Sequence, residues 1–168
     1  MSENLYINQE QAAAGAFNKQ SAIFDNLYSG NAIIEYKRRR VRDDVHRYLL
    51  PHSRILELNA GTGEDAIYFA GKGYRVHATD ISEGMQAALK DKVNAQGLER
   101  VVTTELCSFN KLNTLQQRGP YDLVFSNFAG LNCTGQLEDV LLSFDPLLKP
   151  GGVVTLVILP PFCLWETL

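Results

Sequence analysis

RILELNAGTGEDAIYFA, residues 54–70, combines three patterns that together decide the fold of this 168-residue chain. The apolar run at residues 55–58 is typical of a buried strand, and apolar residues return at helical spacing from Ala66 onwards. Between them, Gly61 and Gly63 permit a positive φ and let a ligand approach the backbone. The stretch therefore predicts a strand, a tight turn and a helix whose free N–H groups point at the bound molecule.

Two kinds of cofactor bind at such a turn, and the charges beside it distinguish them. The Gly-x-Gly-x-x-Ala spacing of residues 61–66 fits a dinucleotide fingerprint, and Asp80 lies where its ribose-binding acid is expected. A dinucleotide would bring its pyrophosphate to the start of the helix, where Glu64 and Asp65 would repel it. S-adenosylmethionine carries ammonium and sulfonium cations and no phosphate, so these acids and Glu57 favour it.

The chain resembles the class I, Rossmann-like, S-adenosylmethionine-dependent methyltransferases that act on small molecules. Members of that family carry an acid-x-Gly-x-Gly-x-Gly loop after their first strand. Glu57, Gly61 and Gly63 match this loop, and Asn59 stands where the first glycine is usual. Asparagine is a tolerable substitute, because it adopts a left-handed conformation more readily than most residues.

Two further segments resemble the family's adenosine site. By resemblance, Asp80 accepts hydrogen bonds from both ribose hydroxyls, while Ile81 and Met85 flank the adenine ring. Ser108 and Phe109 match the position where the family often has an acid that faces the adenine amino group. That acid is missing here, so the Ser108 hydroxyl and the Phe109 backbone N–H are expected to make the contact.

The acceptor side of the site follows from the same resemblance. Residues 121–127 match a fourth strand, and residues 128–133 match the loop at which the methyl group is transferred. Asn127 is then expected at the cofactor, and Asn132 at the substrate. Tyr28, in a Phe-Asp-x-x-Tyr entry motif, is a second expected substrate contact, with an ordinary packed tyrosine as the alternative.

The cofactor-binding residues that the resemblance implies are Glu57, Asn59, Ala60, Gly61, Gly63, Asp80, Ile81, Met85, Ser108, Phe109 and Asn127. No catalytic residue or general base is assigned, because displacement at an activated sulfonium mainly requires alignment of the acceptor. His46, His52 and His77 have no partner at metal or triad spacing, and structural or surface roles are expected for them. No metal site is expected.

The first fifty residues are expected to form a helical lid that precedes the cofactor-binding domain. Apolar spacing predicts helices over residues 11–28 and 31–50. In similar methyltransferases the N-terminal helices fold over the cofactor and shape the acceptor pocket. Residues 1–50 are therefore assigned to the lid and residues 51–168 to the S-adenosylmethionine-binding domain.

The resemblance implies an α/β fold, a doubly wound and mostly parallel sheet with helices on both faces. Residues 147–152 resemble the family's closing Pro-Gly turn, and residues 153–159 a fifth strand. Strands six and seven, which normally follow, are missing, and residues 162–166 resemble the start of a substrate-shaping segment. We expect a fragment of a longer enzyme, and a homodimer through the exposed edge of strand five.

Composition fits a single domain, since 45% of the residues are hydrophobic. Three cysteines form an odd set without metal-ligand spacing, which indicates reduced thiols in a cytoplasmic protein. No apolar run reaches membrane-spanning length, and the N-terminus lacks the layout of a signal peptide.

Nucleic acid is not expected as a partner, because the formal net charge is −3. A local basic run at residues 37–42 has apolar residues at helical spacing within it, so a solvated helix face is expected. A patch for RNA or an acidic substrate is the alternative.

Three functions remain open on the sequence. The leading one is methyl transfer to a small-molecule acceptor, with oxygen, nitrogen and carbon acceptors all possible. The second is a cofactor-binding but catalytically incompetent, truncated domain. The third is an NAD(P)-dependent oxidoreductase, which would have to bind its pyrophosphate despite the acids at the turn.

Overall fold

One parallel sheet organises the chain, of which the computed structural model describes residues 3–160. Its strands run in the order β3-β2-β1-β4-β5, and every pair of neighbours is parallel. Their bounds are β1 (Arg54–Leu58), β2 (Arg75–Asp80), β3 (Val102–Leu106), β4 (Tyr121–Ser126) and β5 (Leu148–Leu156). The order reverses between β1 and β4, and a crevice opens at the carboxyl ends of strands at such a switch point.

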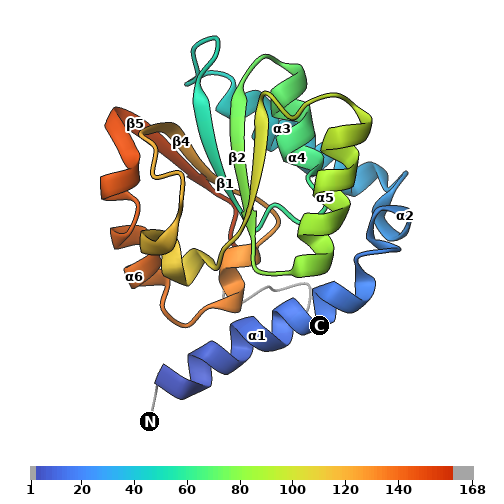
Figure 1. Cartoon of the computed structure of the whole chain (residues 1–168), viewed down its shortest axis with the longest axis vertical. Coiled ribbons are helices and arrows are strands. Elements are labelled where there is room, and N and C mark those ends of the chain that lie inside the picture. The colour runs from blue at the N-terminus through green and yellow to red at the C-terminus, as the bar shows by residue number, and fades with distance from the viewer. Residues whose placement is uncertain (1–2, 161–168) are drawn as a thin grey trace.

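Helices cover both faces of the sheet and the end at which its central strands finish. Their bounds are α1 (Glu3–Gln20), α2 (Phe24–Tyr28), α3 (Ala32–Val45), α4 (Glu64–Gly71), α5 (Glu83–Ala95) and α6 (Leu137–Leu142), with 3₁₀ segments η1 (Phe109–Thr114), η2 (Gly130–Cys133) and η3 (Asp145–Leu147). Figure 1 shows α4 and α5 on one side of the sheet, α6 on the other, and α1 across the end where β1 and β2 finish.

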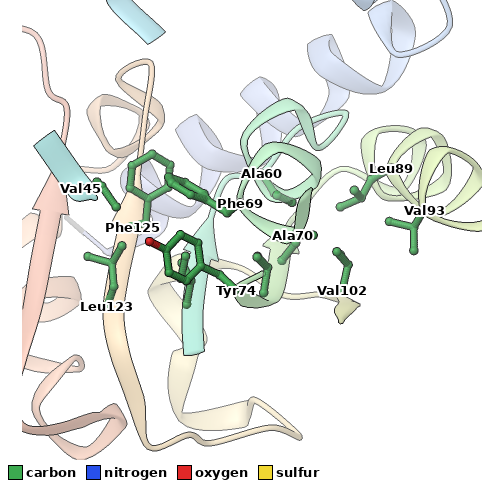
Figure 2. Close-up of a cluster of buried hydrophobic side chains, with 14 of the residues drawn as sticks. Val45, Ala60, Phe69, Ala70, Tyr74, Leu89, Val93, Val102, Leu123 and Phe125 are labelled. Carbon is green, nitrogen blue, oxygen red and sulfur yellow. The ribbon is translucent and has the colours of Figure 1, made fainter. Parts of the chain in front are cut away.

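Two hydrophobic clusters hold these layers together, because successive side chains of a strand point to opposite faces. Ile55 packs on the side of α3, α4 and α5, where Phe69 and Phe125 meet edge to face with ring centroids 5.2 Å apart (Figure 2). Leu56 and Leu58 pack on the side of η1 and α6. The predicted doubly wound arrangement is confirmed.

The helix predicted over residues 11–28 is two helices, broken at residues 21–23. Asn18 is the cause: its Oδ1 accepts hydrogen bonds from the Ser82 hydroxyl at 2.6 Å and the Gly84 backbone N–H at 2.9 Å. Ser21 then lies so close to Gly84 that a Cβ at that glycine would come within 2.5 Å of its hydroxyl oxygen. This contact fixes the end of α1 on the start of α5 and turns the chain.

The fifth strand begins earlier than predicted, at Leu148, and ends at Leu156. A register shift against β4 between Tyr121 and Leu123 accommodates the Pro-Gly-Gly sequence. The segment expected at residues 162–166 lies outside the described residues. Within residues 3–160, no helix has the length and apolar character to cross a membrane.

Candidate functional site

A cavity of about 340 Å³ lies at the carboxyl ends of β1, β2 and β4, with α1, α2 and α3 contributing to its walls. The predicted residues that line it are Tyr28, Glu57, Asn59, Ala60, Gly61, Asp80, Ile81, Met85, Phe109 and Asn127. Gly63, Ser108 and Asn132 are not among its lining residues. The sheet thus gathers into one space most of the residues that the sequence singled out.

The loop after β1 depends on left-handed backbone at three positions. Asn59 has φ 46°, Gly61 φ 56° and Gly63 φ 84°. A Cβ at Gly63 would lie 2.0 Å from Cδ1 of Leu89, so this glycine serves the close packing of α4 on α5. The Asn59 side chain accepts from the Ser126 hydroxyl at 2.6 Å and donates to the Asn127 carbonyl at 3.0 Å. It therefore joins the ends of β1 and β4 at the cavity.

Asp80 closes β2 and organises the loops on either side of it. Its two carboxylate oxygens accept hydrogen bonds from the backbone N–H groups of Gly61 and Ser82, both at 2.8 Å. Burial raises the pKa of Asp80 above its ordinary value, although these backbone bonds oppose the shift. Each oxygen has a second lone pair, so the carboxylate can still accept from a ligand diol.

Glu57 carries the buried side-chain oxygen that lacks a partner. Among the described residues, its Oε2 is the single buried side-chain polar atom without a hydrogen bond. Burial raises its pKa well above the ordinary value, and the charge of Asp65 adds to that rise while Arg38 and Arg42 oppose it. Leaving such an atom unpaired is costly, so a cationic group in the cavity would stabilise it.

Asp65, which the sequence marked only as a charge that would repel a pyrophosphate, is a buried ion-pair centre. Its carboxylate accepts from Arg38 at 2.5 Å, Arg42 at 2.6 Å and the Asn127 side-chain amide at 3.0 Å. The guanidinium of Arg38 also stacks over Phe128, 4.4 Å from the ring centroid, and lines the cavity.

The expected solvated face of the basic run is therefore wrong for Arg38 and Arg42. Both reach across to the first turn of α4, because a buried carboxylate offers them a stronger partner than water and exposed acids do. Their four-residue spacing puts both arginines on one helix face. That spacing is the feature of the sequence that could have predicted a shared partner.

Asp25 on α2 connects the N-terminal helices to the glycine loop. It accepts from the Thr62 hydroxyl at 2.6 Å and pairs with Lys92 of α5 at 2.6 Å, and Lys92 pairs with Glu64 as well. Burial alone would raise the pKa of Asp25, but the bonds from Lys92 and Thr62 leave it below its ordinary value. Tyr28, one turn further on, packs against Phe24 with ring centroids 4.7 Å apart.

A second acid from the N-terminal helices, Glu10 on α1, reaches the end of β3. Its carboxylate accepts from the Ser108 hydroxyl at 2.6 Å and the Asn110 side-chain amide at 2.9 Å. Glu10 is buried and lines the cavity. No motif surrounds it in the sequence, which is why sequence reasoning missed it.

The loop after β4 is strained where it borders the cavity. Phe128 and Ala129 both have left-handed backbone, with φ 53° and 60°, a conformation that costs about 1–3 kcal/mol at each non-glycine residue. Asn132 lies outside the cavity, where its side chain makes two hydrogen bonds with the Leu159 backbone, each 3.0 Å long.

Two of the three histidines have structural partners, and His52 is exposed. His46 bridges the hydroxyls of Tyr68 and Tyr74 at 3.0 Å each, and the His77 ring lies 3.0 Å from Glu105. Over residues 3–160 there is no group of three or more His, Cys, Asp or Glu side chains arranged to hold a metal ion.

Known proteins share this sequence and fold. The demethylmenaquinone methyltransferase of Bacillus cytotoxicus is 31% identical over 153 residues, which cover 88% of this chain and 62% of that protein. The malonyl-[acyl-carrier protein] O-methyltransferase of Hamiltonella defensa is 28% identical over 156 residues, 92% of this chain and 55% of that protein. The chain thus spans about three fifths of the length of these curated relatives.

A solved structure and a family model agree with these relatives. The CcbJ methyltransferase from Streptomyces caelestis superimposes with a TM-score of 0.60 and 29% identity, covering 70% of this chain and 47% of that one. The methyltransferase domain model matches residues 55–152, from the start of the glycine-loop strand to the closing Pro-Gly turn. Because that match covers more than half of the chain, this protein belongs to the methyltransferase domain family and has its class I, Rossmann-like fold.

Proposed function

We propose that the chain binds S-adenosylmethionine in this cavity and transfers its methyl group to a small-molecule acceptor. The observation that carries the proposal is the unpaired Oε2 of Glu57, buried at the cavity wall. Asp65 and Glu64 are paired with Arg38, Arg42 and Lys92. The other lining acids, Glu10, Glu57 and Asp80, have no ion pair among the described residues, a balance that favours a ligand with ammonium and sulfonium groups and disfavours a pyrophosphate. The NAD(P)-dependent alternative is correspondingly weakened.

Each part of the cofactor has a residue suited to it. Asp80 would hold the ribose hydroxyls, and Ile81 and Met85 would contact the adenine ring. Glu57 would pair with the methionine ammonium. Arg38 has further N–H donors beyond the one that it gives to Asp65, and these suit the methionine carboxylate.

The cofactor supplies an activated methyl group on its sulfonium sulfur, so the chain's own task is to align the acceptor and exclude water. We propose residues 1–50 as the lid that does this, since Asp25 and Glu10 fix α2 and α1 over the cavity. Tyr28 and Phe128 line the cavity and are the proposed acceptor contacts. The relatives named above act on unlike acceptors, so their names do not select one.

Two finer parts of the proposal concern assembly and location. We propose that the edge of β5, which pairs with β4 on one side and exposes Val154, joins two copies of the chain. Light scattering that shows a monodisperse monomer would reject this dimer.

A cytoplasmic location is supported by the free thiols of Cys107 and Cys133.

The decisive experiment is calorimetric titration of the chain with S-adenosylhomocysteine, with NADH as the control ligand. We expect micromolar binding of the first ligand and none of the second. In the Asp80→Ala variant, loss of two charge-assisted bonds should weaken binding at least about 100-fold. Binding of NADH, or equal binding by the variant, would contradict the proposal. Once binding is established, methyl transfer to a panel of acceptors separates an active enzyme from a domain that only binds the cofactor.

A further inference from the structure

The end of β3 lacks the carboxylate that the family resemblance led us to expect there, and α1 places one beside it. Ser108 stands at that position, and Glu10 contacts both Ser108 and Asn110 from a helix about one hundred residues earlier in the chain. The carboxylate is buried and borders the cavity. The Glu10 carboxylate thus lies at hydrogen-bonding distance from the residue that occupies the expected position of the acid.

Glu10 retains capacity for a further hydrogen bond. Its Oε1 accepts from Ser108 and its Oε2 from Asn110, one bond to each oxygen. A carboxylate has about four acceptor sites on its two oxygens. Since both protein donors belong to the end of β3 and the start of η1, the remaining lone pairs are available to a donor in the cavity.

Other residues that line the same cavity indicate which part of a ligand would lie near Glu10. Ile81, Met85 and Phe109 provide apolar walls of the same cavity, and Asp80 at the end of β2 marks the ribose side. Glu10 is close enough to Asp80 for its charge to raise the pKa of that carboxyl. A planar base between these walls would lie in the same cavity that the Glu10 carboxylate borders.

We propose that the Glu10 carboxylate accepts a hydrogen bond from the amino group of adenine, in place of the missing acid at the end of β3. The proposal rests on S-adenosylmethionine binding in the cavity. It makes α1 part of the adenine site, because the acceptor for the amino group is present only when that helix is docked. Asn18, on the same helix, holds Ser82 and Gly84 at the start of α5, so one docking event completes both sides of the base pocket.

The test compares two ligands on the full chain: S-adenosylhomocysteine, and S-inosylhomocysteine, in which an oxygen replaces the amino group. Glu10 would hydrogen-bond the first base and face the carbonyl oxygen of the second. We expect the wild-type chain to prefer the adenosine ligand by about 10- to 100-fold. In the Glu10→Gln variant the side-chain amide can donate to that oxygen, and the preference should fall below about 3-fold.

One contrary outcome and two control variants separate this role from a structural one. If Glu10 only anchors α1, Glu10→Gln weakens both ligands by the same factor, the preference stays unchanged, and the proposal is overturned. Glu35→Gln, an exposed change on α3 away from the cavity, should leave the preference intact. Adding Ser108→Asp to Glu10→Ala should restore the preference, because it returns a carboxylate to the end of β3, and this variant also decides the case if Glu10→Gln folds poorly.

The outcomes also distinguish this inference from the proposed function. A wild-type chain that binds both ligands equally well would overturn the role of Glu10 and leave cofactor binding intact. A wild-type chain that binds neither ligand would overturn both.

Discussion

Replacing Asp65 by asparagine should destabilise the protein strongly, because this carboxylate compensates two guanidinium groups. The Asp65 side chain is 3% exposed, and those of Arg38 and Arg42 are 20% and 15% exposed. Asparagine keeps the size of the side chain and removes its charge. Two largely buried cations would then lose their partner at once.

The size of the effect follows from burial. Removing one partner of a buried ion pair costs about 3–5 kcal/mol. The two arginines keep some contact with water, so we expect the lower end, about 3 kcal/mol. For a chain of this length, each kcal/mol lowers the melting temperature by about 2–4 °C, giving a shift of about 6–12 °C.

Glu64 provides a matched control in the same helical turn. Its side chain is 53% exposed and pairs with Lys92 at 2.9 Å, so Glu64→Gln should cost no more than about 1 kcal/mol. Urea unfolding followed by circular dichroism measures both variants, and the m-value should stay constant. If Asp65→Asn is no more destabilising than Glu64→Gln, the ion-pair centre does not hold α3 on α4 and the reasoning fails.

Two other changes probe the glycine loop and the unpaired acid. Gly63→Ala places a methyl group 2.0 Å from Leu89 at φ +84° and should lower the free energy of unfolding by about 2–4 kcal/mol, measured by thermal unfolding. In Gly61→Ala the new methyl group has no atom within 4 Å, and the loss should be about 1 kcal/mol. Equal losses of stability in the two variants would contradict the packing argument. Burial raises the pKa of Glu57. Below that pKa the free protein carries a proton there, which a ligand ammonium must displace, so S-adenosylhomocysteine affinity should increase as pH rises towards the pKa and level off above it. In Glu57→Gln the rise should shrink, and an unchanged profile would place the ammonium elsewhere.

Sequence reasoning predicted those cavity-lining residues that short segments of the chain encode. A buried strand that ends in an acid and a glycine turn brings its own geometry, so Glu57, Gly61 and Asp80 were predicted and do line the cavity. Ser82 likewise sits directly before α5 and caps it, since its hydroxyl accepts from the Met85 backbone N–H at 3.2 Å. In each case the sequence pattern and the residue that it predicts lie within a few positions of one another.

The remaining contacts could not be predicted, because they join segments that are distant along the chain. Glu10 meets Ser108 across 98 positions, and Arg38 meets Asp65 across 27. Such pairs form only where helix docking brings them together, and no local spacing marks them. The break between α1 and α2 has the same origin, since Asn18 is fixed by residues of α5.

The helix α2 has no buried residues. Its Asp25 makes polar contacts with Thr62 and Lys92 of the sheet domain. Charge pairs as exposed as Asp25 and Lys92, at 41% and 24%, are screened by salt, whereas packed apolar layers are not. Ionic strength should therefore act on the rate at which ligands enter and leave, through local opening of α2, while it leaves the global free energy of unfolding almost unchanged. If α2 covers the cavity as proposed, its polar attachment would let salt adjust access to the cavity without loosening the core.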